Sequence, residues 1–248
     1  MIMDMHAHLW EGQFEKNKKQ IMTVCQNYNL SKVFVSSLQD SVERPPEDEI
    51  TRLNNATSQF MREEPSTIRG WCYVNPANKN ALSVLRHGIE DQGMSGMKLW
   101  IATFCDDPLV YPLAEYCAEH QVPILIHTFY KAVGQLQYES LGANVANLAR
   151  RYPELKIQMA HYGASCVREI KPIVPYKNVW VDTSGSIYHR DDIDYIKKMI
   201  GSSRIIFGTD MPFISYLLNY GQIMEADLTA EEREAVFSGN ALHMLERS

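Results

Sequence analysis

The chain has 248 residues and a formal net charge of −6, and 45% of its residues are hydrophobic and 22% charged. These values are ordinary for a soluble globular enzyme, and the length suits one large α/β unit, so we predict a single domain over residues 1–248. Acidic and basic residues are mixed along the chain, which argues against binding to nucleic acid or to a membrane surface. The longest apolar runs have the length of strands and fall far short of the roughly 20 residues that cross a bilayer.

The five cysteines are scattered, odd in number and without a CxxC pair. This usage is typical of reduced thiols, not of a disulfide framework. Because the chain begins directly with a strand-like run, we expect no signal peptide before it. We therefore expect a cytoplasmic protein.

Strand-like and helix-like patterns alternate along the whole chain. In the first half, apolar runs of strand length are followed by segments with apolar residues at helical spacing. In chain order these pairs are 1–9 and 16–30, 32–36 and 47–63, 68–74 and 78–91, and 94–100 and 109–120.

The second half continues this alternation. Its pairs are 123–127 and 143–152, 156–161 and 166–174, 179–182 and 191–200, and 204–210 and 214–224, with a last helix over 229–246. Thr229 and Glu232 have the spacing of a capping box at the start of that last helix. Eight strands that are each followed by a helix, within about 250 residues, predict a single-domain (βα)₈ TIM barrel. An open doubly wound sheet needs fewer strands, and no GxGxxG motif follows any strand.

The first strand carries the sequence Asp4-Met5-His6-Ala7-His8. Side chains on a strand alternate between its two faces, so we expect Asp4, His6 and His8 to point the same way. Two neighbouring imidazoles with a carboxylate behind them form half of a metal site. Asp4 is expected to orient a metal-binding imidazole and not to bind the ion itself.

Further polar residues lie at or near the ends of later strands. In a barrel, the C-terminal ends of all strands meet at one face, where active sites lie. The residues expected to converge there are His6, His8, Lys98, His127, His161 and Asp210.

Three imidazoles and one carboxylate suit Zn²⁺ or a similar divalent ion, with a position left open for water. Water bound to such an ion has its pKa lowered toward roughly 7. Asp210 could both bind the ion and move a proton, so we assign it a catalytic role. His161 is expected to polarise a substrate carbonyl or to orient the attacking water, with metal binding as a further alternative.

Several motifs resemble the amidohydrolase superfamily, in particular its amidohydrolase-related branch, which includes the aminocarboxymuconate-semialdehyde and resorcylate decarboxylases. The matching segments cover essentially the whole chain, and DxHxH together with GTDxP is the specific combination. They are DxHxH at 4–8, GMKL at 96–99, IH at 126–127, MAHYG at 159–163, FGTDMP at 207–212 and GNA at 239–241.

The resemblance implies that His6, His8, His127 and Asp210 bind the metal and that His161 is catalytic. One ion is expected. Relatives with two ions carry a carbamylated lysine on the fourth strand, and Lys98 matches that position, so two ions are the alternative. In many relatives with one metal, a lysine here binds an anionic group of the substrate instead.

The leading functional prediction is a metal-dependent hydrolase that acts on a small carboxylate, lactone or amide through metal-activated water. The alternative is a non-oxidative decarboxylase of a small aromatic or unsaturated acid. A barrel that binds metal and ligand without turnover is a third hypothesis, disfavoured by the intact proton-transfer groups. Trp100 and Tyr162 follow predicted strands, so we expect them, with Lys98, to contact a small-molecule substrate. A homodimer through the outer helices is a further expectation.

Overall fold

The computed structural model describes residues 1–39, 43–186 and 189–246. Its strands form one parallel sheet in the order β1 to β8, so strands that follow one another in the sequence are neighbours in space. The strands are β1 (Ile2–Trp10), β2 (Leu30–Leu38), β3 (Ile68–Tyr73), β4 (Gly96–Leu99), β5 (Ile124–Ile126), β6 (Ile157–Met159), β7 (Val179–Asp182) and β8 (Ile205–Ile206).

Hydrogen bonds from β1 to the segment after β8 close the sheet into a barrel. The Met5 N–H donates to the Phe207 carbonyl oxygen at 3.0 Å, and Ala7 pairs with Met211 in parallel. The TIM-barrel prediction is therefore confirmed.

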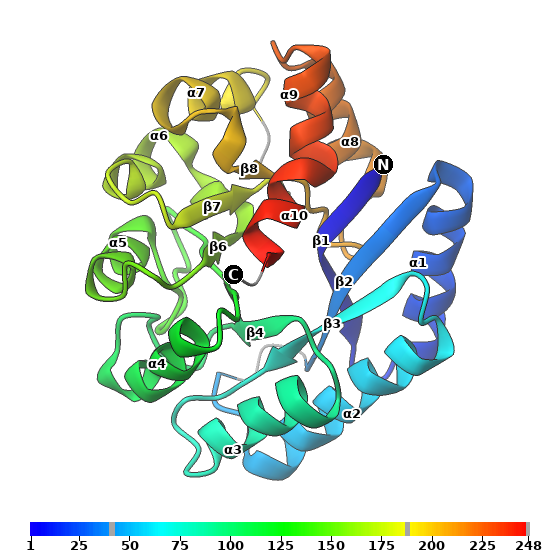
Figure 1. The fold of residues 1–248 in the computed structure, drawn as a ribbon, viewed down its shortest axis with the longest axis vertical. Coiled ribbons are helices and arrows are strands. Elements are labelled where there is room, and N and C mark those ends of the chain that lie inside the picture. The colour runs from blue at the N-terminus through cyan, green and yellow to red at the C-terminus, as the bar shows by residue number, and fades with distance from the viewer. Residues whose placement is uncertain (40–42, 187–188, 247–248) are drawn as a thin grey trace.

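The helices surround the strands, except for α10, which lies across the centre of the ring (Figure 1). They are α1 (Phe14–Tyr28), α2 (Glu47–Glu63), α3 (Ala81–Arg86), α4 (Tyr111–Glu119), α5 (Gly142–Arg151), α6 (Cys166–Glu169), α7 (Asp192–Ile200), α8 (Tyr216–Glu225), α9 (Ala230–Glu234) and α10 (Asn240–Leu245). The Thr229 hydroxyl and the Glu232 side chain form the predicted capping box at the start of α9.

Several predicted elements differ from the structure. The helix predicted over 78–91 ends as α3 at Arg86 and is followed by a π-helical turn at His87–Asp91. The helix predicted over 166–174 is split into α6 and a separate 3₁₀ turn that contains Pro172, which lacks the N–H of a regular helix. The helix predicted over 229–246 is interrupted by a π-helical turn at Ala235–Gly239. The strand predicted over 204–210 pairs with β7 only at 205–206, because the Phe207 N–H donates to Val236 O instead.

Two apolar layers hold the barrel together. The inner cluster contains Met3, Met5, Phe34, Trp71, Leu125, Ala160, Trp180 and Ile206, and α10 packs Ala241 and Met244 onto it. The outer cluster joins the strands to the surrounding helices. Since α10 covers the inner cluster at one end, the opposite end of the barrel is left for a site.

The regular alternation of side chains along β1 is interrupted. The prediction that Asp4 shares a face with His6 and His8 is therefore wrong. The pairing of β1 with β2 shifts between Asp4 and Ala7, as in a β-bulge. Met3 and Met5 belong to the inner cluster, and Asp4 between them points the other way. After the bulge, His6 and His8 face inward, while Ala7 belongs to the outer layer.

The buried Asp4 side chain joins β1 to the end of β8 instead of orienting an imidazole. Its Oδ1 accepts from the backbone N–H groups of His6 at 3.0 Å and Thr209 at 3.1 Å, and its Oδ2 accepts from the Thr209 hydroxyl at 2.5 Å. Burial raises the pKa of Asp4 to about 7.

All five cysteines are buried free thiols. Burial raises the pKa of Cys25, Cys72 and Cys166 to about 12. Because the thiolate is the reactive form, we expect a chromogenic disulfide reagent at mildly alkaline pH to label the native protein very slowly. Unfolding in denaturant should release all five thiols at once, whereas rapid labelling of the native protein would contradict their burial.

Across the described part of the chain, none of the helices combines the length and the apolar character that a bilayer crossing requires.

Candidate metal centre and active site

The ends of β1 and β8 bring two imidazoles and one carboxylate together. His6 Nε2 lies 3.0 Å from His8 Nε2, and Asp210 Oδ1 lies 3.1 Å from His8 Nε2 and 3.9 Å from His6 Nε2. Both imidazoles are buried, whereas the Asp210 side chain is 14% exposed. Ligand atoms of the three residues all lie within 4.8 Å of one another, a spacing that one ion can bridge.

Backbone geometry explains how Asp210 reaches β1. Asp210 has φ of 65°, a left-handed conformation that aspartate tolerates better than most residues. Its N–H donates to the His6 carbonyl oxygen at 2.7 Å. A Cβ at Gly208 would lie only 3.0 Å from His6 Cβ, so glycine allows this segment to approach β1 closely.

Each imidazole on β1 has a partner on its other ring nitrogen. His6 Nδ1 lies 3.0 Å from Asp182 Oδ2, and His8 Nδ1 lies 2.9 Å from Ser36 Oγ and 3.3 Å from Ser36 O. Carboxylate and carbonyl oxygens only accept hydrogen bonds, so we assign the proton to Nδ1 in both rings. Both Nε2 lone pairs and the Asp210 carboxylate then converge, and they repel one another unless a cation lies between them. The donor set therefore fits a divalent metal ion.

The carboxylate of Asp182, at the end of β7, contacts several residues of the site. Its Oδ2 faces His6 and also accepts from Gln158 Nε2 at 2.7 Å. Its Oδ1 accepts from the His161 N–H at 2.8 Å and from the Ser184 N–H and hydroxyl at 3.1 and 2.5 Å. Asp182 therefore contacts both His6 and Ser184, which follows it in the turn after β7.

His161 and His127 lie side by side next to this cluster. His161 follows β6 in a left-handed conformation, with φ of 58°. Its Nδ1 lies 2.9 Å from Ser184 Oγ, and its Nε2 lies 3.2 Å from His127 Nδ1. His127 Nε2 lies 2.8 Å from Glu139 Oε1. Among the described residues, His127 does not join the group formed by His6, His8 and Asp210, whereas His161 forms a second group with His6 and Asp182.

Burial sets the charge state of the site. It lowers the pKa of His6, His8, His127 and His161 below the usual range, and the nearby Lys98 lowers the pKa of all four further. All four imidazoles are therefore neutral at pH 7, the state in which histidine binds metals. Burial alone would raise the pKa of Asp210, but its close contact with His8 holds that pKa below its usual range.

Lys98, on β4, lies buried beneath the cluster, with its Nζ 3.1 Å from His6 Nε2. Burial lowers the pKa of Lys98 to about 8, so a fraction of the amine is neutral near pH 7. Lys98 does not line the cavity above the cluster. The two roles expected for Lys98, anion binding and a carbamylated bridge, stay predictions.

A cavity of about 510 Å³ opens above the cluster. Trp100, which was predicted to contact substrate, lines it, and its ring packs edge-on against Trp10 at 6.0 Å between centroids. The remaining lining residues are His8, Glu11, Gln13, Leu38, His127, Phe129, Lys131, Leu136, Glu139, His161, Ser186, Asp210 and Phe213. Acid–base groups therefore line a cavity to which Trp10, Trp100, Phe129 and Phe213 contribute aromatic rings.

Tyr162, which was predicted to contact substrate, does not line this cavity. Tyr162 has φ of 35°, and its buried side chain belongs to the outer apolar layer. Its hydroxyl lies 3.1 Å from Asp192 Oδ2 on α7 and accepts from Gln222 Nε2 at 3.3 Å. The left-handed turn after β6 turns His161 toward the cavity and Tyr162 away from it, which a strand pattern does not reveal.

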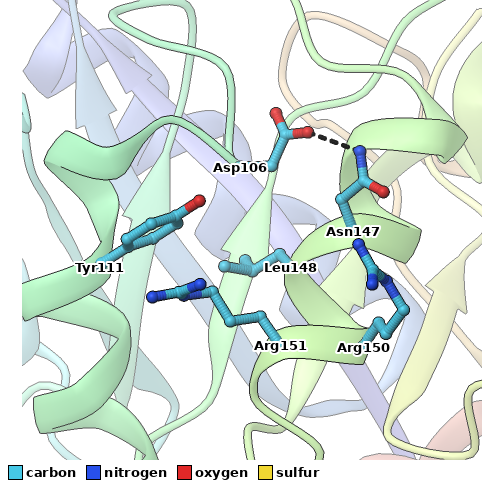
Figure 2. Close-up of a pocket in the computed structure, with 6 residues that line it drawn as sticks. All are labelled: Asp106, Tyr111, Asn147, Leu148, Arg150 and Arg151. Atoms are coloured by element: carbon cyan, nitrogen blue, oxygen red, sulfur yellow. Dashed lines mark hydrogen bonds between the residues drawn. The ribbon is translucent and has the colours of Figure 1, made fainter.

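A second pocket, of about 310 Å³, lies at the outside of the barrel beside α4 and α5 (Figure 2). Its lining residues are Asp106, Tyr111, Asn147, Leu148, Arg150 and Arg151. Asn147 Nδ2 donates to Asp106 Oδ2 at 2.8 Å, so its one carboxylate is already engaged. None of the predicted site residues lies here, and we assign no reaction to this pocket.

Known proteins similar to this chain include several decarboxylases. The 2-amino-3-carboxymuconate-6-semialdehyde decarboxylase of Dictyostelium discoideum is 22% identical, and the alignment covers 78% of this chain and 65% of that relative. The match thus spans less than two thirds of the relative's length.

Two solved structures share the fold at low sequence identity. The 2,6-dihydroxybenzoate decarboxylase from Rhizobium superimposes with a TM-score of 0.80 at 15% identity, covering 98% of each chain. A dihydroxybenzoic acid decarboxylase from Polaromonas sp. JS666, with bound manganese and the inhibitor 2-nitroresorcinol, gives a TM-score of 0.77 at 15% identity, covering 98% of this chain and 96% of that chain.

The family model described as amidohydrolase matches residues 3–247, nearly the whole chain. The motifs from 4–8 to 239–241 predicted the same family. The chain therefore belongs to the amidohydrolase family and is an enzyme of the amidohydrolase superfamily.

Proposed function

We propose that this protein is a metal-dependent, non-oxidative decarboxylase of a small aromatic or unsaturated carboxylic acid. The observation that carries the proposal is the convergence of His6, His8 and Asp210 beside a cavity lined by aromatic rings. Decarboxylases among the similar proteins support this reaction class. They favour it over hydrolysis, the leading prediction from the sequence.

In this proposal His6, His8 and Asp210 hold one divalent ion. The ion, when bound, supplies a Lewis acid for the oxygen atoms of the substrate's acid group. The Polaromonas relative binds manganese, so the proposal is for a divalent ion and not for the zinc that the sequence predicted.

Asp210 is the group that moves the proton. Because its pKa lies below the usual range, it is ionised at neutral pH and can accept a proton from a hydroxyl or acid group of the substrate. It then delivers that proton to the carbon whose bond to the carboxylate breaks. The electron pair of the broken bond forms the new C–H bond, and CO₂ leaves.

The walls of the cavity suit a flat, conjugated substrate. Trp10 packs against Trp100 and lies 6.2 Å from Phe213 between ring centroids. On the opposite wall, the ring of Phe129 is parallel to that of His127, at 6.1 Å and 7°. Aromatic faces bind planar π-systems by offset or edge-on stacking.

A labelling experiment in D₂O separates decarboxylation from hydrolysis. Metal-loaded protein is incubated with a panel of hydroxybenzoic acids, unsaturated dicarboxylic acids, lactones and amides. We expect release of CO₂ from at least one acid, with one deuteron at the carbon that lost it. Hydrolysis of a lactone or amide in H₂¹⁸O, with ¹⁸O in the acid product and no CO₂ from any acid, would overturn the proposal. Stoichiometric metal without turnover of any compound would also overturn it and indicate a binding protein.

A further inference from the structure

Helix α8 presents an apolar face to solvent. Leu217 and Leu218 are each 53% exposed, and Met224 is 45% exposed. The opposite face of the helix, which packs on the barrel, is formed by Tyr216, Asn219 and Ile223. Single exposed apolar residues are common on protein surfaces, but several on one face of a helix are typical of an interaction surface.

Gly221 lies in the middle of this face, because residues 217, 221 and 224 have the i, i+4, i+7 spacing of one side of a helix. Inside a helix, glycine costs roughly 1 kcal/mol of stability relative to alanine. Neither conformation nor space within the chain requires a glycine here, since its φ is not positive and a Cβ would meet nothing within 4 Å. A glycine at this place does allow a second helix to approach the backbone closely.

A groove of about 490 Å³ lies beside the N-terminal end of this face. It lies between α1 and the segment from Met211 to Leu217, and α1 and α8 are neighbours around the ring (Figure 1). The rings of Tyr28 and Tyr216 stack at 4.7 Å between centroids and join the two helices. Lys16 and Lys19 of α1 also line the groove, so it combines apolar walls with positive charge.

The two ends of the α8 face carry opposite charges. Lys19 lines the groove together with Leu217, whereas Glu225 follows Met224 at the C-terminal end of the helix. Both charged side chains are exposed, and neither forms an ion pair within the part of the chain that the structure describes. Two such faces placed antiparallel bring unlike charges together at both ends, whereas a parallel arrangement brings like charges together.

We propose that α8 and the adjoining groove form the interface of a homodimer, in which the two copies of α8 pack antiparallel about a two-fold axis near Gly221. In such a contact the same surface of both copies is used, so each pairing of residues occurs twice. Leu217 and Met224 lie at similar distances on either side of Gly221, so Leu217 contacts the partner's Met224. The flexible methionine side chain fills the groove. The partner's Glu225 then lies next to Lys19.

The oligomeric state of the full-length protein is measured by sedimentation velocity. We expect the parent at roughly 100 μM to have twice the mass of the chain, because a micromolar Kd gives mostly dimer at that concentration. Leu217→Gln should raise the dimer Kd by at least about 10-fold, as expected for an apolar residue at the centre of an interface. A parent that stays monomeric would overturn the inference and leave this face to a partner of another kind.

Leu109 offers a matched control. It is 47% exposed and directly precedes α4, on the other side of the ring from α8 (Figure 1). Leu109→Gln is expected to dimerise as the parent does. The inference would also be overturned if Leu217→Gln dimerised as tightly as the parent, or if Leu109→Gln weakened the dimer equally.

Gly221→Gln serves if Leu217→Gln does not fold. Glutamine is the better helix former, and its Cβ meets nothing within the chain, so the monomer should be at least as stable as the parent monomer. The added side chain separates the two helices, so the dimer Kd should rise by at least about 10-fold. A dimer of parental affinity in this variant would contradict the crossing of the helices near Gly221.

An exchange of charges tests the antiparallel arrangement. Lys19→Glu and Glu225→Lys should each raise the dimer Kd by about 3- to 10-fold, because each places like charges at both ends of the interface. The double variant restores unlike pairs and should return to within about 2-fold of the parental Kd. A double variant that dimerises no better than either single variant would overturn the arrangement.

Discussion

Replacement of Asp210 by Asn will lower kcat by about 10²- to 10⁴-fold, the usual contribution of a positioned acid–base group. The amide keeps the size of the side chain and an oxygen atom, but it cannot take up and release a proton. In the parent, the carboxylate lies 3.1 Å from His8 Nε2, and its pKa is held below the usual range. The measurement is the initial rate of CO₂ release by metal-loaded protein at saturating substrate.

The control is Asp106→Asn, the same substitution in the outer pocket, where Asp106 contacts Asn144 and Asn147 and not the metal cluster. This variant should retain the activity of the parent. If Asp210→Asn kept more than about one tenth of the parental kcat, Asp210 would not be the group that moves the proton.

Replacement of Asp182 by Leu will reduce the free energy of unfolding by about 3–5 kcal/mol, because it removes one partner from a buried charged network. His6, Gln158, His161 and Ser184 all direct hydrogen bonds at this carboxylate. Leucine cannot accept any of them, so several buried donors are left unsatisfied. Urea denaturation, followed by the signal of the buried tryptophans, measures the loss.

The pH dependence of this contribution follows from the sign of the pKa shift. Burial alone would raise the pKa of Asp182, but the contact with His6, whose Nδ1 donates to the carboxylate, lowers it below its usual value of 3.8. A carboxyl with a depressed pKa in the folded state stabilises the protein above the unfolded-state pKa and loses that effect as pH falls through the folded-state value. The difference between parent and Asp182→Leu should therefore be constant near neutral pH and shrink only in acid.

A matched pair of isosteric variants separates the effect of Asp182 on stability from its effect on metal binding. Asp182 and Asp192 are both buried acceptors, but Asp192 contacts Tyr162 and Cys166, away from the cluster. Asp182→Asn and Asp192→Asn should both reduce the free energy of unfolding by about 1–3 kcal/mol. Only Asp182→Asn should also weaken metal binding, by about 10- to 100-fold, because it alone disturbs a partner of His6. Equal metal affinities in both variants would contradict the role assigned to Asp182.

The order of strands and helices could be predicted from sequence because the periodicities of two and about 3.6 persist along nearly the whole chain. The convergence of His6, His8 and Asp210 followed from one rule, that the C-terminal ends of barrel strands share a face. The structure brings these three together at 3.0–3.9 Å.

The errors arise where local geometry departs from a regular strand. A bulge in β1 turns Asp4 away from His6, and a left-handed turn after β6 separates His161 from Tyr162. Glu139 and Ser184 were missed because they lie in loops, and their distances to the histidines depend on how the whole barrel places those loops. The signal in the sequence that could have indicated Glu139 is its place in the loop between β5 and α5, the loop that begins with the predicted ligand His127.

The central claim is that His6, His8 and Asp210 form a single site for a divalent ion. Its most direct test is calorimetric titration of chelator-treated protein with manganese and, separately, with zinc. The account predicts one ion per chain in the parent and in His87→Ala, whose imidazole is exposed and pairs with Asp91, and no measurable binding in His6→Ala. A parent that binds neither ion, or a His6→Ala variant that binds one with the affinity of the parent, would contradict it.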